Sequence, residues 1–487
     1  MFKIIQKYKH EFVLAILVLL YISYFTLASF LRYDNFYTGR FDLGNMDHTV
    51  WNTINGRIFQ ASDDNGEIVS RLSAHADFIL ILLSPFYLLW SHPKTLLLIQ
   101  TIVLALGAVF VYLIAEKILK NKSSTDSVLD KNFALLFGFL FLMYPALQFT
   151  NLYDFHGVTI ATTTLLASFY FLIKRSYFLM IVFLILSGIT KEQVWTITFF
   201  FGIPLLFQKA KRVKFLGTII IVTSLALFYY LVAVAIPQNT NGQHFALSYY
   251  SDFGDTPTQV VKNIFLSPSK LISAIFEASR IGYLNQLFMP FGFMSLLSPL
   301  ALFFAIPDLL IGLLSNNSHL RQIYYQYTAT ITPFILISAI FAVKNFSKWF
   351  SKIPKYCIAI YLLFLTLFSA YSFGPLPWAK RANTDMFTKP QSNREIIEDF
   401  LSKIPEKYTI AATNNLGSHL SQREVIYTIP IGIDKADIVL FLLNDRFAQP
   451  SLGAQRQMVE KLKQDKNYIK VFEKDNFVVF KKPGVLL

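Results

Sequence analysis

The sequence is poor in cysteine and in charged residues. Its single cysteine, Cys357, lies in an apolar run, so no disulfide can form within the chain, and the thiol says nothing about redox compartment. Only 15% of the residues are charged, whereas 54% are hydrophobic and 16% are aromatic. Many apolar runs reach the ~20 residues that a helix needs to cross ~30 Å of hydrocarbon. This composition excludes an ordinary water-soluble domain and predicts a multi-pass protein of the cell membrane.

Two further absences concern targeting and nucleic acid. No small-x-small cleavage site follows the first apolar run, "EFVLAILVLLYISYFTLASFL", so this run is predicted to be a retained anchor that ends at Leu31. The net charge of +14 could suggest nucleic-acid binding, but the basic residues stand in short clusters between apolar runs. That pattern is typical of membrane topology, so we expect the lipid bilayer and no nucleic acid as a partner.

Five basic clusters orient the predicted helices. The positive-inside rule places all five in the cytoplasm, which gives eleven spans, an inner N-terminus and an outer C-terminus. The clusters are Lys3/Lys7/Lys9, Lys117/Lys120/Lys122/Lys131, Lys174/Arg175, Lys209/Lys211/Arg212/Lys214 and Lys344/Lys348/Lys352/Lys355. The spans fall near 11–31, 95–116, 132–150, 157–173, 177–190, 194–208, 215–236, 284–298, 299–315, 326–343 and 356–374. Three prolines break the region 284–315, so its span limits are the least defined.

One apolar segment does not fit as a span. "HADFILILLSPFYLLW" (75–90) is short and is broken by Pro85. If it crossed the bilayer, the basic loop at 117–131 would lie outside. We therefore expect it to form an interfacial helix within a first outer loop at 32–94.

From Trp378 onward the composition becomes that of a soluble domain. "NREIIEDFLSKI" and "QMVEKLKQ" predict helices, "YTIAAT", "EVIYTI" and "DIVLFLL" predict strands, and "YIKVFEKDNFVVFKK" predicts a hairpin with Asp-Asn at its turn. The expected organisation is a membrane domain at 1–377 and a small exoplasmic α/β domain at 378–487. The tail has no phosphate-binding glycine loop, which argues against a nucleotide-binding domain.

The unusual polar residues gather at the predicted outer ends of the spans. The basic counts that set the topology did not use these residues, so their convergence on one face is partly independent evidence for one exoplasmic site. The clusters are Asp42/Asp47/His48, His75/Asp77, Asp154/His156, Lys191/Glu192 and His319/Arg321/Tyr324/Tyr325.

The first cluster opens a predicted amphipathic helix at 43–57. The apolar residues that recur there at helical spacing are Leu43, Met46, Val50 and Ile54. Asp42 is then at the N-cap, where its carboxylate can cap free N–H groups for ~1 kcal/mol. Asp42 can also be a catalytic base at the bilayer surface, and the two roles are compatible. Trp51, taken alone, is typical of an interfacial anchor.

The other clusters each allow more than one role. Asp154 and His156 are two positions apart, so only a loop could aim both at one divalent metal; a carboxylate that orients the imidazole, or two hydrated residues, fits as well. Lys191 beside Glu192 can snorkel or can bind a lipid phosphate. Arg321 can be a surface charge or a phosphate ligand.

Tyr324 and Tyr325 can belong to an aromatic belt or can stack on a sugar. Asp308 follows Pro307 inside an apolar run, where an ionisable group is costly and usually paired or functional. It can also simply begin a helix after the proline.

The motifs in this order resemble a known membrane family. They are "FDLGNMDHTVWNTINGRIF", "HADFILILLSPFYLLW", "DFHG", "GITKEQVW", "YYQYTATITPFI" and the tail segment "NNLGSHLSQREVIYTIP". They are similar to the family called domain of unknown function 2079, which looks related to the GT-C superfamily of membrane glycosyltransferases.

The resemblance implies a GT-C-like fold whose first outer loop carries an acidic catalytic residue and two juxtamembrane helices. Asp42 matches the acidic position, and residues 78–90 match a juxtamembrane helix. Lys191 resembles a lysine that follows a span in lipid-A-type sugar transferases. The motifs Phe-Asp-Leu-Gly, "HADF" and Lys-Glu differ from those of some relatives, so donor and acceptor do not carry over.

The resemblance also implies a mechanism. A sugar would pass from a polyprenyl-phosphate donor to an exoplasmic acceptor by an inverting displacement with Asp42 as the base. The substrate and its leaving phosphate would be held by Lys191, Glu192, Arg321, Tyr324, Tyr325 and Trp51. The site would be shaped, or an optional divalent metal bound, by Asp47, His75, Asp154 and His156.

Two other classes of function stay open. A transporter or flippase usually places ionisable groups near the bilayer midplane on broken helices, often with inverted repeats. Here the polar clusters stand at span ends, and the sequence has no internal repeat. A membrane scaffold would leave the five clusters unexplained, although several could be interfacial anchors.

Overall fold

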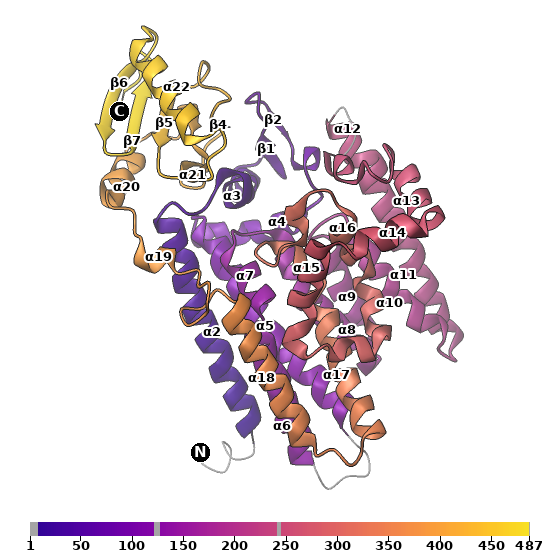
Figure 1. The fold of residues 1–487 in the computed structure, drawn as a ribbon. Helices are drawn as coiled ribbons and strands as arrows, with labels where there is room; N and C mark the ends of the chain where they lie inside the picture. Colours follow the sequence, from indigo (N-terminus) through magenta and orange to yellow (C-terminus); the bar gives the residue numbers. More distant parts are fainter. Residues whose placement is uncertain (1–7, 121–126, 241–244, 487) are drawn as a thin grey trace.

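A bundle of long apolar helices forms the larger part of the protein (Figure 1). The computed structural model describes residues 8–120, 127–240 and 245–486, so Lys3, Lys7 and Lys122 of the basic clusters lie outside it. Five helices in these ranges are long and apolar enough to cross a membrane, and a sixth span results if α6 and α7, bent by 45°, count as one. They are α2 (Lys9–Asp34), α5 (Lys94–Leu119), α6 (Ser127–Leu142) with α7 (Pro145–Leu152), α8 (Ile160–Lys174), α11 (Lys211–Tyr230) and α18 (Lys355–Phe373).

The predicted count of eleven spans is not reproduced by helix length. The other helices of the bundle are α9 (Tyr177–Gly188), α10 (Val194–Leu206), α12 (Ile236–Thr240), α13 (Pro257–Leu266), α14 (Pro268–Ile275), α15 (Ala278–Phe288), α16 (Ile306–Leu314) and α17 (Thr332–Trp349). The predicted span at 284–298 is wrong. There α15 ends at Phe288, and short 3₁₀ turns follow because Pro290 cannot donate a helical hydrogen bond and Gly292 and Phe293 have positive φ.

Close packing and ion pairs hold the bundle together. Gly202 of α10 lies so near α11 that an added Cβ would sit 2.6 Å from the carbonyl oxygen of Gly217, which is how small residues let membrane helices approach. At the end where α2 begins, Lys131 pairs with Glu11 at 3.1 Å. Lys355 pairs with Asp130 at 3.4 Å. Lys9 begins α2, so Lys9, Lys131 and Lys355, from three of the basic clusters, share one end of the bundle.

The opposite end of the bundle carries the first loop. It contains α3 (Asn45–Ile54), the hairpin of β1 (Gln60–Ser62) and β2 (Ile68–Ser70), and α4 (Ile79–Leu83) followed by a 3₁₀ turn to Leu88. Leu43 and Val50 pack against Leu80 and Leu83. The helical stretch at 79–88 is about 15 Å long at 1.5 Å per residue, half the hydrocarbon thickness, so it is too short to span, as predicted.

The tail forms a five-stranded sheet of order β4-β3-β5-β7-β6. β3 is parallel to β4 and β5, and β7 is antiparallel to β5 and β6. The elements are α19 (Asp385–Thr388), α20 (Arg394–Ser402), β3 (Ile410–Ala412), α21 (Asn414–Gly417), β4 (Ile426–Thr428), β5 (Ile438–Leu442), α22 (Leu452–Gln464), β6 (Ile469–Lys474) and β7 (Phe477–Lys481). Each predicted strand is present, and the last two turn at Asp475 and Asn476. The domain boundary at Trp378 stays a prediction.

The tail sits over the first loop, at the end of the bundle opposite the N-terminus (Figure 1). Its α21 lies beside α3 and the turn that precedes it, and Phe36 from the end of α2 is part of the tail's apolar core. The first loop is therefore enclosed between the bundle and the tail.

Candidate functional site

Asp42 lies in a π-helical turn that leads into α3. The turn comprises Arg40–Gly44. The hydroxyl of Tyr153 donates to Oδ2 of Asp42 at 2.9 Å, and Nε2 of His156 lies 3.0 Å from Oδ1. The prediction that Asp42 caps the helix is wrong, because α3 begins after Gly44 without a side-chain cap and the Asp42 carboxylate is turned toward the bundle. Its side chain is 29% exposed, so a ligand can reach it.

The surroundings of Asp42 keep its carboxylate charged. Burial raises the pKa of Asp42, but the hydrogen bond and charge of His156, together with the hydrogen bond from Tyr153, outweigh burial and lower the pKa below its ordinary value. Burial and the charge of Asp42 raise the pKa of Tyr153, so the phenol remains a donor. The site thus presents an ionised, partly exposed carboxylate in a fixed orientation.

A glutamine of the helix bundle holds the loop at 153–157 in place. Gln100 of α5 accepts the backbone N–H of His156 at 3.1 Å and donates to the carbonyl of Asp154 at 3.3 Å. Gln100 was not predicted from the sequence, although a buried amide within an apolar run is an unusual residue that could have been noticed. These bonds fix the direction in which the His156 ring points.

Asp154 supports the same turn rather than a metal. Its Oδ2 accepts the N–H of Gly39 at 2.8 Å, and Arg32 lies 3.7 Å from Oδ1. Burial first, and then the charge of Asp42, raise the pKa of Asp154 to about 6. Asp154 and His156 aim at different partners, an arrangement that does not favour the metal pair that the sequence left open as one alternative. No group of three His, Cys, Asp or Glu side chains suited to a metal occurs in the described part of the chain.

Two rings contact the Asp42 carboxylate, and two more tyrosines pack against the first of them. Tyr153 stacks on His156 with ring centroids 5.5 Å apart, and Tyr325 meets the Tyr153 ring edge-on at 4.9 Å. Tyr324 lies 5.8 Å from Tyr153 and 5.1 Å from Tyr325. Burial, and to a smaller extent Asp42, raise the pKa of Tyr325. The structure therefore packs the two predicted tyrosines against Tyr153, the residue that donates to Asp42.

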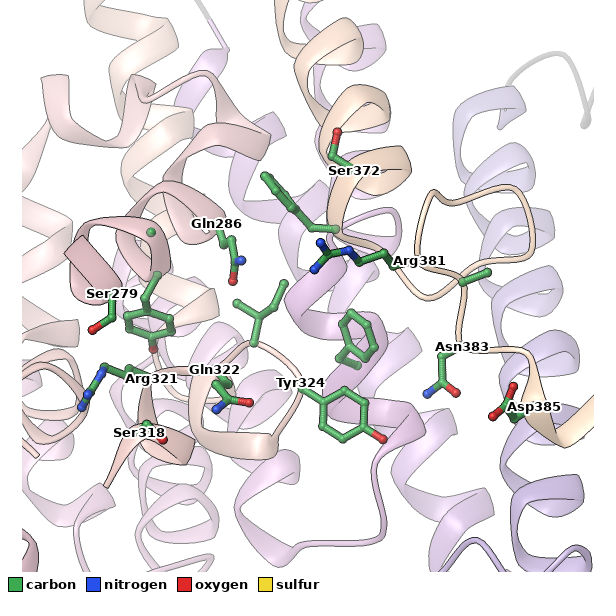
Figure 2. A pocket seen from close by; sticks show the side chains of 16 residues that line it. Ser279, Gln286, Ser318, Arg321, Gln322, Tyr324, Ser372, Arg381, Asn383 and Asp385 are labelled. Carbon is green, nitrogen blue, oxygen red and sulfur yellow. The ribbon is translucent and has the colours of Figure 1, made fainter. Parts of the chain in front are cut away.

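Tyr324 also lines a cavity of 630 Å³ between α15, α18 and the loops at 318–324 and 381–385 (Figure 2). Exposed Arg381 points into the cavity, whereas Arg321 stands at its wall and turns its guanidinium toward the Ser315 carbonyl at 2.7 Å and the carboxylate of Glu277 at 4.0 Å. Arg381 was not predicted from the sequence and lies just after the expected boundary at Trp378. Arginine is a common phosphate ligand, and both Arg321 and Arg381 line this cavity.

An apolar groove adjoins this cavity. It has a volume of 610 Å³ and shares Gly282 with the cavity. Its lining residues are Ala278, Ile281, Gly282, Leu284, Asn285, Phe288, Phe293 and Leu296. Ile281, Phe293 and Leu296 are exposed at its surface, which suits an acyl or prenyl chain. A Cβ added to Gly282 would have no other atom within 4 Å, so the passage between the cavity and the groove is open at this residue.

His75, Lys191 and Glu192 form a second group. Nδ1 of His75 lies 2.9 Å from Oε1 of Glu192, whose other oxygen accepts the N–H of Ala76 at 3.0 Å. Lys191 is half-buried and does not line the cavity of Arg321. The group adjoins the Asp42 cluster through Gly157, where an added Cβ would lie 3.4 Å from the Thr190 carbonyl.

Asp47 and Trp51 lie apart from Asp42. Asp47 is buried and accepts hydrogen bonds from Tyr87 at 2.5 Å, Ser421 at 2.6 Å and Gln422 at 3.1 Å. It therefore connects α3 to the tail, and three donors already occupy the carboxylate that was expected to shape the site or to bind a metal. Trp51 follows Asp42 by about 13 Å along the helical run and lies under the guanidinium of Arg57 at 5.4 Å.

Two comparisons with known proteins found a match to this chain. A family model described as "Predicted membrane protein (DUF2079)" matches residues 32–479. No curated protein matches the sequence. Among solved structures, ArnT from Cupriavidus metallidurans bound to undecaprenyl phosphate is similar, with a TM-score of 0.57 and 10% identity over 95% of this chain and 97% of that chain. At this identity the likeness shows only that the chain shares the overall fold of ArnT, which is a GT-C glycosyltransferase.

Proposed function

This chain belongs to the DUF2079 family of predicted membrane proteins, and from that premise and its GT-C-like fold we propose that it is a membrane glycosyltransferase. The donor is a sugar on a polyprenyl phosphate, and the acceptor is on the exoplasmic side. The observation that carries the proposal is the partly exposed carboxylate of Asp42, held by His156 and by Tyr153. The Tyr153 ring lies 5.8 Å from that of Tyr324, which lines a cavity together with Arg321 and Arg381. The crystal structure of ArnT holds undecaprenyl phosphate, which supports a lipid phosphate as the ligand here.

The geometry suggests where each part of the donor binds. The phosphate occupies the cavity between Arg321 and Arg381, and the prenyl chain passes Gly282 into the apolar groove. The sugar then lies on the side of Tyr324 that faces Asp42, where tyrosine rings offer stacking surfaces.

The reaction is a single displacement. Asp42 takes the proton from the acceptor hydroxyl while the hydroxyl oxygen forms a bond to the anomeric carbon. The bond from that carbon to the phosphate oxygen breaks, and the electron pair leaves with the lipid phosphate. Arg321 and Arg381 stabilise the charge that develops there. Asp154 is engaged by Gly39, so one carboxylate is available, which matches an inverting reaction.

The rival functions fit the site less well. Asp42, His156 and Asp154 of the candidate site lie in turns or loops at the ends of helices, whereas a transporter places its ionisable groups near the bilayer midplane. A scaffold would not need a partly exposed carboxylate held by both a phenol and an imidazole.

The test uses the full chain in lipid nanodiscs. The probe is a panel of polyprenyl-phosphate sugars with a radiolabelled hexose or pentose, presented together with a cell-envelope extract as acceptor. We expect label to leave the lipid fraction with the wild type and not with Asp42→Asn. The proposal fails if the wild type neither transfers label nor is stabilised thermally by undecaprenyl phosphate relative to the uncharged undecaprenol.

A further inference from the structure

A side chain of the tail caps the turn that carries Asp42. Oδ1 of Asn414 accepts the backbone N–H of Arg40 at 2.8 Å and that of Phe41 at 3.2 Å. The first N–H groups of a helical turn have no partner within the turn, and a local Ser, Thr, Asp or Asn usually supplies one. Here the preceding residue is Gly39, which has no side chain, so the acceptor comes from 374 residues away.

Three glycines let the tail approach this closely. A Cβ added to Gly39 would sit 2.7 Å from Nδ2 of Asn414, and one added to Gly417 would sit 2.2 Å from Cβ of Arg40. A Cβ on Gly44 would sit 3.3 Å from the backbone of Gly417. The segments "GRFDLG" and "NNLG" therefore fit each other as backbone surfaces, and the contact leaves no room for side chains at these points.

A second set of bonds fastens the same segments. Ser418 and Thr38 lie 2.7 Å apart through their hydroxyls. Nε2 of His48 accepts the N–H of Ser62 at 3.0 Å, so Nδ1 carries the proton and donates to the Ser421 carbonyl at 2.7 Å. Burial and neighbouring arginines lower the pKa of His48 to about 3, so this neutral tautomer persists at physiological pH.

We propose that Asn414 is a positioning residue of the active site, and that the tail must dock on the first loop for Asp42 to be held in its reactive orientation. The inference rests on the proposed function for its effect on catalysis. Its structural part, the dependence of the Arg40–Gly44 turn on Asn414, stands on the contacts alone. The tail then acts as part of the enzyme rather than as an independent binding module.

The test compares Asn414→Ala with a matched control in the same helix. Asn415 is the neighbouring residue; its amide donates to the Leu442 carbonyl at 3.0 Å and to Asn444 at 2.6 Å, away from the Asp42 turn. Asn415→Ala therefore removes a similar number of hydrogen bonds from the tail without touching residues 39–44. Asn414→Asp is the rescue variant, because a carboxylate oxygen can accept the same two N–H bonds.

Two readouts are taken on the full chain. Hydrogen–deuterium exchange of peptides that cover residues 37–46 should be roughly tenfold faster or more in Asn414→Ala, the factor for one lost hydrogen bond, and unchanged in Asn415→Ala. The kcat of sugar transfer should fall about 10- to 100-fold in Asn414→Ala, since a displacement of about 1 Å can cost 10²-fold, while the KM for the donor stays within about twofold. Asn414→Asp should restore both.

The outcomes separate this inference from the proposed function. Equal exchange in the wild type and Asn414→Ala, or equal losses of kcat in Asn414→Ala and Asn415→Ala, would overturn the positioning role. A wild type without transfer activity would refute the proposed function, and with it the catalytic part of the inference. The exchange result would then decide whether Asn414 holds the turn.

Discussion

Nε2 of His156 lies 3.0 Å from Oδ1 of Asp42, although 114 positions separate the two residues in the chain. The contact joins the first loop to a loop at the end of the bundle. It holds the carboxylate in one direction and favours its charged form. A general base needs both properties, so the predictions about catalysis begin with this pair.

Replacing Asp42 by asparagine tests its role as the base. Asparagine retains an oxygen that can accept from Tyr153 and an amide that can donate to His156, so the free energy of unfolding should change by less than about 1 kcal/mol. It cannot take a proton near neutral pH, so kcat should fall by about 10²–10⁴-fold. Sugar transfer and thermal unfolding of the same preparation give both quantities. Full activity in Asp42→Asn would exclude Asp42 as the base.

His156→Phe should shift the pH profile of the reaction. The ring bulk and the burial of Asp42 remain, but the hydrogen bond and charge that lower its pKa are lost, so the pKa of Asp42 rises. Because the base works only when ionised, the acidic limb of kcat against pH should move to higher pH. Tyr153→Phe removes a smaller contribution and should give a smaller shift in the same direction. A limb that stays in place in both variants would contradict this account.

The sequence predicted where helices and strands occur better than it predicted where a helix is broken. Apolar runs of sufficient length identify α2, α5 and α18, because burial in lipid requires a simple excess of hydrophobic residues. The alternating strands and the Asp475–Asn476 turn of the tail follow from local patterns. The 3₁₀ turns after Phe288 were not predicted, because hydropathy does not register the positive φ of Gly292 and Phe293.

The site was predicted in its residue types and only partly in its contacts. Asp42, His156 and Tyr325 meet as the motifs suggested, because each stands at the end of a helix on the same side of the bundle. The role of Asp47 could not be deduced, since its partner Ser421 belongs to the tail, and no local pattern encodes a contact across 374 positions. The role of Asn414 was not predicted for the same reason, because it contacts Arg40 across 374 positions.

Arg321 and Arg381 should govern donor binding. Each guanidinium can form charge-assisted bonds with the lipid phosphate, so Arg321→Ala and Arg381→Ala should each raise the KM for the donor about tenfold or more. The matched control is Lys407→Ala, which removes an exposed cation of the tail that stacks on Tyr408 at 5.1 Å. Equal effects of all three changes would indicate a general charge effect rather than a phosphate site.

The orientation in the membrane is testable with single cysteines after Cys357→Ser. Asp64 lies in the first loop and Phe447 in the tail, and both are exposed, so cysteines at these positions should react with a membrane-impermeant maleimide in intact cells. A cysteine at exposed Ser351, beside the last basic cluster, should react only after lysis. Labelling of Ser351→Cys but not Asp64→Cys in intact cells would reverse the topology.

Asp47 should make the stability of the protein depend on pH. Burial raises the pKa of Asp47 to about 6 in the folded state, although the hydrogen bonds from Ser421, Tyr87 and Gln422 lower it. In the unfolded chain the carboxyl has its ordinary pKa of 3.8. Between these values the folded state binds a proton that the unfolded state does not, so stability rises as pH falls from about 6 to about 4.

The measurement compares how the free energy of unfolding changes with pH in the wild type, Asp47→Asn and Ser421→Ala. Asp47→Asn removes the titration, so the wild type should gain up to about 3 kcal/mol relative to the variant between pH 7 and pH 4, at about 1.4 kcal/mol per pKa unit. Ser421→Ala removes a hydrogen bond that lowers the pKa of Asp47, so its stability should begin to rise at a higher pH than in the wild type. Unfolding in detergent at a series of pH values gives all three curves. Parallel curves for the wild type and Asp47→Asn would mean that Asp47 stays ionised in the folded protein throughout this range.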